Sequence, residues 1–155
     1  MRYVLIFVFI LFSFNSAYTD GGSPKPVGLG FIIGEPSGFH AKFRLSNRND
    51  IDAMLGFDFD EWIFLHADYL WNFPISSSAD LGVYVGPGVF IASHTGDHYS
   101  DEHHHDTRFG PQGVFGLRII LGNQFDIFGE AQLRMNIIDD TDINVHGGLG
   151  AHIFF

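Results

Sequence analysis

The sequence contains no cysteine, which excludes disulfide bridges and thiolate zinc sites. Basic residues are scarce: eight Lys and Arg stand against eighteen Asp and Glu, giving a formal net charge of -10. Nucleic acids attract clustered Lys and Arg, so this balance argues against nucleic acid as a partner. Helical patterns are absent as well, because no segment places apolar residues at helical spacing behind a capping box.

The one long apolar run lies at the start of the chain. A short basic start is followed by apolar residues 4–12 and then by a small, polar stretch that ends at Ala17. The run is too short to span a bilayer as a helix, which needs about 20 residues, so we expect residues 1–17 to be a secretory signal peptide. An uncleaved N-terminal anchor is the alternative. Residues 18–26 form a Gly-, Ser- and Pro-rich lead, and 27–155 form one domain.

The rest of the chain alternates apolar and polar residues with a period of two, which predicts β-strands. In the clearest segment, Phe125, Ile127, Leu133 and Met135 alternate with polar residues that include Glu130 and Arg134. About eight such segments occur, and roughly ten residues is the length a tilted strand needs to cross a bilayer. The predicted strands cover residues 27–33, 38–45, 51–59, 63–73, 79–93, 108–121, 125–137 and 143–155.

Charged residues gather on one face of nearly every predicted strand. A lipocalin-like barrel would turn apolar faces inward and show a surface rich in Lys and Glu, which are few here. A membrane barrel reverses this arrangement, and mixed charges inside a small barrel can pair with one another. The sequence therefore predicts an all-β fold, an eight-stranded antiparallel up-and-down transmembrane β-barrel. The residues predicted inside are Lys42, Arg44, Asp52, Asp58, Asp68, Asp80, Arg108, Arg118, Asp126, Glu130 and Arg134.

Aromatic residues and the closing strand agree with that fold. Tyr69, Trp71 and Phe73 lie near one strand end, as in the aromatic girdle at a membrane interface. The final strand, 143–155, ends on Phe155 without a polar tail, and an unpaired edge of this kind would aggregate. We therefore expect the final strand to pair with the first.

The longest predicted loop, 94–107, combines imidazoles with carboxylates, a ligand set that suits Zn, Ni or Cu(II). The spacing matches no rigid metal motif, so the loop is predicted to bind such an ion weakly, and no other cofactor is expected. The same composition also fits a loop that only keeps the surface hydrated and negative. Strand parity places this loop on the outer side of the membrane. The candidate ligands are His98, Asp101, His103, His104, His105 and Asp106.

Candidate catalytic groups are few. Ser93 stands beside His94 near a barrel rim, and His66 and Asp68 share an inward face. No Ser-His-acid arrangement can be placed from these spacings, so the protein is predicted not to be an enzyme. Hydrogen bonding inside the barrel is the expected role of the inward histidines, which include His146 and His152.

Several short stretches form a recognisable set: Gly34-Glu35-Pro36 with Gly38, His66-Ala67-Asp68-Tyr69-Leu70-Trp71 with Phe73-Pro74, Tyr84-Val85-Gly86 with Gly88, Arg108-Phe109-Gly110 and Gly147-Gly148-Leu149-Gly150. With these stretches the chain resembles bacterial outer-membrane barrels of the OmpA/OmpX type, and more closely a family of short outer-membrane barrel proteins without an agreed activity. The terminal Phe155 is similar to the signal that barrel-assembly machinery reads.

The resemblance implies a monomer in the bacterial outer membrane, with membrane lipid and the assembly machinery as partners. The expected function is that of an integral barrel with a side-chain-filled lumen and a structural or surface-interaction role. A surface module that binds metal through its loop is the main alternative. A lipid-modifying enzyme and a narrow pore are the others.

Overall fold

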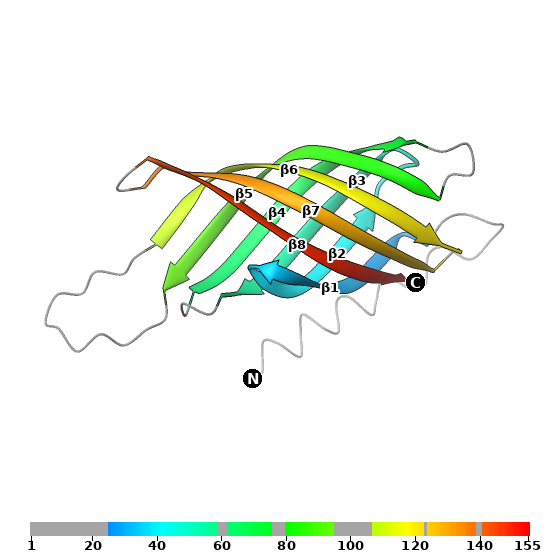
Figure 1. Ribbon diagram of the computed structural model, residues 1–155, viewed down its shortest axis with the longest axis horizontal. Helices are drawn as coiled ribbons and strands as arrows, with labels where there is room; N and C mark the ends of the chain where they lie inside the picture. The colour runs from blue at the N-terminus through cyan, green and yellow to red at the C-terminus, as the bar shows by residue number, and fades with distance from the viewer. Residues whose placement is uncertain (1–24, 59–61, 76–79, 95–106, 123, 139–140) are drawn as a thin grey trace, which may run out of the picture.

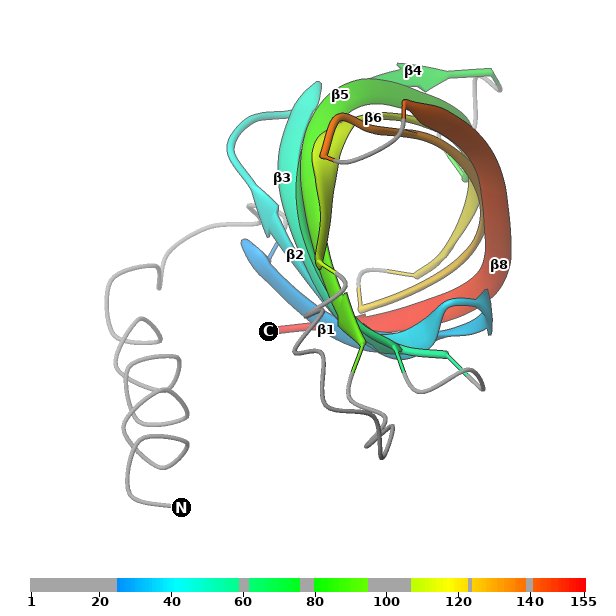
Figure 2. The ribbon, with the colours of Figure 1, turned by 90° about the vertical axis from the view of Figure 1, so that its left-hand side faces the viewer.

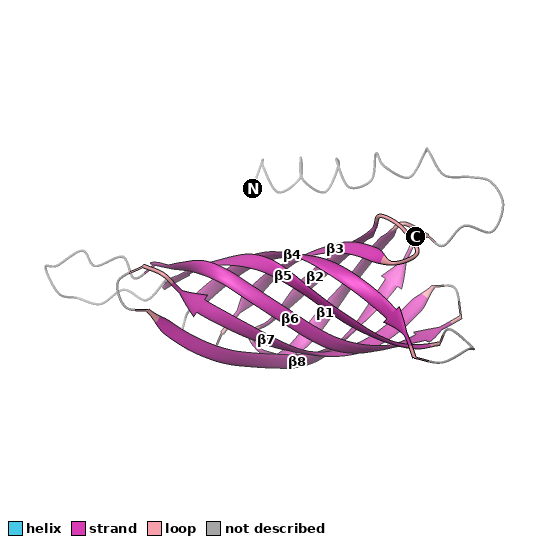
Figure 3. Ribbon diagram, turned by 90° about the horizontal axis from the view of Figure 1, so that it is seen from above, coloured by secondary structure: helices cyan, strands magenta, loops and turns pink. Residues whose placement is uncertain are grey.

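The described part of the chain is a closed antiparallel β-barrel. The computed structural model describes residues 25–58, 62–75, 80–94, 107–122, 124–138 and 141–155, and every element in these ranges is a strand (Figure 3). Within them, no helix is long and apolar enough to cross a membrane. The strands are β1 (Val27–Glu35), β2 (Ser37–Arg44), β3 (Asn49–Phe57), β4 (Trp62–Pro74), β5 (Leu81–His94), β6 (Thr107–Leu121), β7 (Phe125–Asn136) and β8 (Asp142–Phe154).

Each strand pairs with its neighbours in sequence, and β8 returns to pair with β1 (Figures 1 and 2). This seam runs from Gly28 opposite Phe154 to Glu35 opposite Gly147. At its end, the backbone N–H of Phe155 donates to the carbonyl of Val27 at 2.8 Å. The predicted fold class and the pairing of the final strand with the first are both confirmed.

The barrel has two distinct ends. The end that holds the start of β1 and the end of β8 is called the terminal end here, and the opposite end the loop end. Because the strands alternate in direction, the connections after β1, β3, β5 and β7 all lie at the loop end. His94 and Thr107 therefore mark where the chain leaves and re-enters the barrel there, as strand parity predicts.

Side chains alternate between the lumen and the outer surface. Leu133 is 54% exposed, whereas the next residue, Arg134, is 2% exposed. Large apolar side chains are exposed on all eight strands, while buried charged residues point inward. The predicted orientation, apolar outside and polar inside, is confirmed, and the lipocalin-like alternative is wrong.

The predicted interior set needs two corrections. Asp80 is exposed and lies just before β5, so its assignment to the lumen is wrong. The predicted strand begins at residue 79, whereas β5 begins at Leu81. Conversely, the predicted strand 51–59 leaves out Asp50, which lies within β3 and is 1% exposed.

Inward-facing glycines make room for large side chains in the lumen. A Cβ on Gly116 would overlap with the ring of Tyr84, and a Cβ on Gly150 would overlap with the ring of Phe128. Tyr84 and Phe128 are both almost fully buried and belong to one apolar cluster in the lumen. The small residues thus let bulky neighbours fill the space that a barrel of eight strands encloses.

Candidate functional site

The lumen holds a continuous polar network, and it begins with an ion pair near the terminal end. Arg118 on β6 reaches across the lumen, and its Nη1 lies 3.3 Å from Oδ2 of Asp50 on β3. The guanidinium of Arg44 lies 3.7 Å from the centre of the Phe154 ring. Two arginines therefore lie at this end, one paired with a carboxylate and one stacked on an aromatic ring.

Two histidines contact one another in the middle of the lumen, across the inward face of β1. His152 on β8 lies 2.7 Å from Asp126 and 2.8 Å from His40, measured between ring nitrogens and their partners. Nε2 of His40 lies 3.8 Å from Asp52. The ring of Phe128 stacks on His152 at 4.4 Å between centroids. The result is a buried chain of two adjacent imidazoles with a carboxylate at each end, contributed by β2, β3, β7 and β8.

The Lys42 side chain lies beside these histidines and carboxylates but forms no ion pair among the described residues. It is fully buried, and its Nζ has no hydrogen-bond partner. The ammonium instead lies 4.6 Å from the Tyr84 ring centre and 5.4 Å from that of Phe128. The Tyr84 hydroxyl donates to Glu130 at 2.9 Å. Aromatic faces thus supply part of the stabilisation that a carboxylate would give this cation.

A row of amides continues the network toward the loop end. Nε2 of Gln112 contacts both His66 and Asp68, and these two side chains lie 3.0 Å apart. Nε of Arg134 donates to Oε1 of Gln112 at 3.1 Å, and its Nη2 donates to Oε1 of Gln132 at 2.5 Å. The two glutamines therefore fix the plane of a buried guanidinium.

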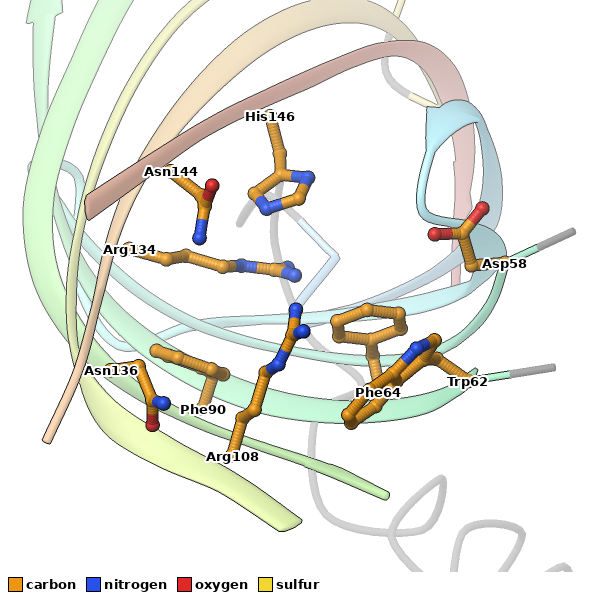
Figure 4. A pocket seen from close by; sticks show the side chains of 9 residues that line it. All are labelled: Asp58, Trp62, Phe64, Phe90, Arg108, Arg134, Asn136, Asn144 and His146. Carbon is orange, nitrogen blue, oxygen red and sulfur yellow. The ribbon is translucent and has the colours of Figure 1, made fainter. Parts of the chain in front are cut away.

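Above that guanidinium the lumen opens into a pocket of about 140 Å³ (Figure 4). Its walls include Phe64 and Phe90, and its polar lining includes Asp58, Arg108, Arg134 and His146. Arg134 lies 5.0 Å from the Phe64 ring centre, and Arg108 lies 4.3 Å from that of Trp62. The pocket therefore combines two cations with aromatic walls.

One buried group of side chains has the composition of a metal site. Ligand atoms of His40, Asp52 and Glu130 all lie within 4.8 Å of one another. However, the register places Lys42 directly opposite Asp52, and the Lys42 ammonium is buried in the same region. A divalent cation next to this ammonium would be repelled in a medium of low dielectric constant. The neighbouring ammonium therefore makes this group a poor site for a divalent cation.

The structure brings some of the predicted site residues together and separates others. His66 contacts Asp68 as their shared face indicated, while His146 lies toward the loop end and away from the His152 chain. Ser93 and His94 alternate along β5, so their side chains lie on opposite faces of the sheet. The six candidate metal ligands lie outside the described residues: His98, Asp101, His103, His104, His105 and Asp106.

The alternating sequence pattern does not predict this pocket. Its lining comes from Asp58, just after β3, and from β4 to β8, so no short motif contains it. The available signal was the period-two pattern, which placed Arg108 and Arg134 on inward faces. Register puts Gln112, which is on the same face of β6 as Arg108, directly opposite Arg134 on β7. The long side chains of the two arginines then reach the same pocket. Only strand pairing, and not spacing along the chain, reveals such a site.

Together these features define a small closed barrel with an apolar exterior and a polar, filled lumen, and solved structures of that class are similar to this chain. The N-terminal β-barrel domain of Pseudomonas aeruginosa OprF aligns with a TM-score of 0.66 and 15% identity, covering 87% of this chain and all of that one. Neisserial surface protein A aligns with a TM-score of 0.57 and 15% identity, and the alignment covers 88% of this chain and all of that one. A de novo designed transmembrane β-barrel aligns with a TM-score of 0.56 and 12% identity, and the alignment covers 86% of this chain and 99% of that one. No sequence-family profile and no curated protein matches the chain.

Proposed function

We propose that this protein is an integral β-barrel of the bacterial outer membrane, with a filled lumen and a structural or surface-interaction role. The observation that carries the proposal is the apolar outer surface, which continues around all eight strands of a closed sheet. Water-soluble monomers rarely expose a contiguous apolar patch larger than a few hundred Å². A lipid bilayer is the solvent that such a surface matches.

The height of the barrel supports the same reading. β7 contains 12 residues. At a rise of ~3.4 Å per residue and a tilt of ~45°, a strand of this length spans ~29 Å along the membrane normal. The apolar band of outer-membrane barrels is ~25 Å tall, so the strand covers the band and reaches both interfaces. Trp71 and Phe73, 43% and 51% exposed, lie toward the terminal end, where a girdle is expected.

The filled lumen favours a structural role over conduction. Arg134, Tyr84, Lys42 and Phe128 are among the largest fully buried side chains, and all four point inward. Barrels of eight strands enclose just enough space for side chains, whereas porins need about 16. We therefore expect no steady ion conductance and, without a placed nucleophile and base, no enzymatic activity.

Cell fractionation tests the proposed location. The full chain, produced with its own leader in a Gram-negative host, is expected in the outer-membrane fraction and to resist extraction by alkaline carbonate. It should also migrate differently on a gel before and after heating, as a folded barrel does. Recovery of folded protein from the soluble periplasm without detergent would overturn the proposal.

The assembly partner can be tested with a matched pair of variants. Phe155 and Phe73 are exposed to a similar extent, 48% and 51%, and both lie toward the terminal end. If the terminal aromatic is read by the assembly machinery, Phe155→Ser will lower the amount of folded barrel in the outer membrane, while Phe73→Ser will not. Equal loss in both variants would assign the effect to lipid contact instead.

A further inference from the structure

Arg134 has an unusual environment for a buried cation. It is 2% exposed, and its Nε and Nη2 donate only to the neutral amide oxygens of Gln112 and Gln132. Nη1 has no hydrogen-bond partner. Among the described residues, no carboxylate lies within ion-pair distance of this guanidinium. A buried guanidinium normally acquires an anionic partner, because its removal from water is costly.

A second cation is directed at the same space. Figure 4 shows the guanidinium groups of Arg108 and Arg134 pointing toward one another from two neighbouring strands, with His146 above them. Nδ1 of His146 also lacks a partner. Asp58 is the one acidic residue of the described lining and stands on the other side of the pocket (Figure 4). In a chain with a net charge of -10, this convergence of like charges is a local reversal of sign.

The walls of the pocket are aromatic. Phe64 and Phe90 are 5% and 4% exposed, and their ring centres lie 5.0 and 5.4 Å from the guanidinium of Arg134. The guanidinium of Arg108 lies over the ring of Trp62, 4.3 Å from the ring centre. The pocket volume, about 140 Å³, is close to that of an engineered apolar cavity of about 150 Å³ that binds benzene.

We propose that this pocket binds a small, soluble carboxylate with a flat apolar body. The carboxylate lies between Arg108 and Arg134, because a planar guanidinium group can donate two parallel hydrogen bonds to a carboxylate. The apolar body packs against Phe64 and Phe90. Lipid headgroups do not fit, since the lining residues face the lumen and acyl chains would have to enter it. Inorganic phosphate satisfies the charges but leaves the aromatic walls uncovered. This inference goes beyond the proposed function and depends only on the interior of the folded barrel.

Tryptophan fluorescence can report on the pocket directly. The chain has two tryptophans, Trp62 at the pocket and Trp71 on the outer surface. In a Trp71→Phe background, purified in a non-ionic detergent, the emission of Trp62 is measured during titration with benzoate, benzyl alcohol or inorganic phosphate. Benzoate is expected to give a saturable change and to bind about tenfold or more tightly than either of the other two. Equal binding of benzyl alcohol or of phosphate would overturn the proposal.

Charge variants locate the site. In the same background, Arg108→Gln, at the exposed mouth, is expected to weaken benzoate binding by about tenfold or more, since a charged hydrogen bond is lost. Arg134→Lys, which keeps the charge but removes the fork, should also weaken it. Arg118→Gln removes a lumen cation at the terminal end and should leave it unchanged. The heat-dependent gel shift verifies that each variant is folded. Unchanged binding in both pocket variants, or equal loss in all three, would refute the assignment.

Discussion

Arginine substitutions on the outer surface provide a graded test of how the barrel sits in a bilayer. Leu149, Leu133 and Phe125 are 71%, 54% and 49% exposed, and all three point outward from β8 or β7. A charge at each position would face the surrounding medium rather than the lumen. In water such substitutions would be almost neutral, whereas in lipid their cost depends on depth.

The expected cost follows from the position along the strand. With ~2.4 Å of height per residue, Leu149 lies ~2 Å, Leu133 ~6 Å and Phe125 ~13 Å from the middle of its strand. Arginine costs about 2–4 kcal/mol at the midplane and about 0–1 kcal/mol near the interface. Leu149→Arg should therefore cost about 2–4 kcal/mol, Leu133→Arg about 1–2 kcal/mol and Phe125→Arg at most about 1 kcal/mol.

Reversible unfolding by urea in lipid vesicles measures these values. Alanine at each of the three positions is the control that separates the charge from the loss of the side chain. The dependence of the free energy of unfolding on urea concentration should be the same in all variants, so that midpoint shifts report stability. Equal costs at the three depths, or the largest cost at Phe125, would refute the proposed placement of the strands in the membrane.

Three further outcomes are expected. Gly116→Ala should destabilise the barrel by about 1–3 kcal/mol, since the added Cβ overlaps with Tyr84, while Gly113→Ala, with open space around it, should change stability by no more than about 0.5 kcal/mol, both measured by urea unfolding. In planar bilayers the purified protein should show no steady conductance, and stable channels would contradict the filled lumen. Zinc titrations near pH 7 should show weak binding that falls below about pH 6 as imidazoles protonate. That binding should disappear when four loop residues are replaced by alanine: His98, His103, His104 and His105. Equal zinc binding by this variant and by the unaltered protein would exclude the loop as the binding site.

The sequence was sufficient for the strands and their orientation because burial in a barrel repeats every second residue. In β7, buried positions such as Arg134 alternate with more exposed positions such as Leu133 along most of the strand, so the pattern predicts a strand and its orientation clearly. It failed where a turn carries a residue type that also suits the lumen. Asp80 and Asp50 both adjoin turns, and only the hydrogen-bonded register distinguishes the exposed one from the buried one.

The arrangement inside the lumen could not be derived from the pattern. Period two places Lys42 inside but does not indicate that aromatic rings, rather than a carboxylate, surround its ammonium. The expectation that the inward charges would pair is met by Arg118 with Asp50, but not by Lys42 or Arg134 within the described residues. Such contacts depend on shear, which shifts each strand relative to the next and is not encoded in any single segment.

The hydrogen bond between Phe155 and Val27 holds the first and last strands together, so the chain could begin at a different strand without changing which strands pair. Since the described ends of the barrel domain touch, a short linker could join them, and new ends could be opened in the turn between β2 and β3. Such a circular permutant would retain every strand pair and every lumen contact but would no longer end on an aromatic residue. It would therefore separate the contribution of the seam to stability from that of a C-terminal phenylalanine to delivery, since the permutant should refold in vitro even if it is not inserted in cells.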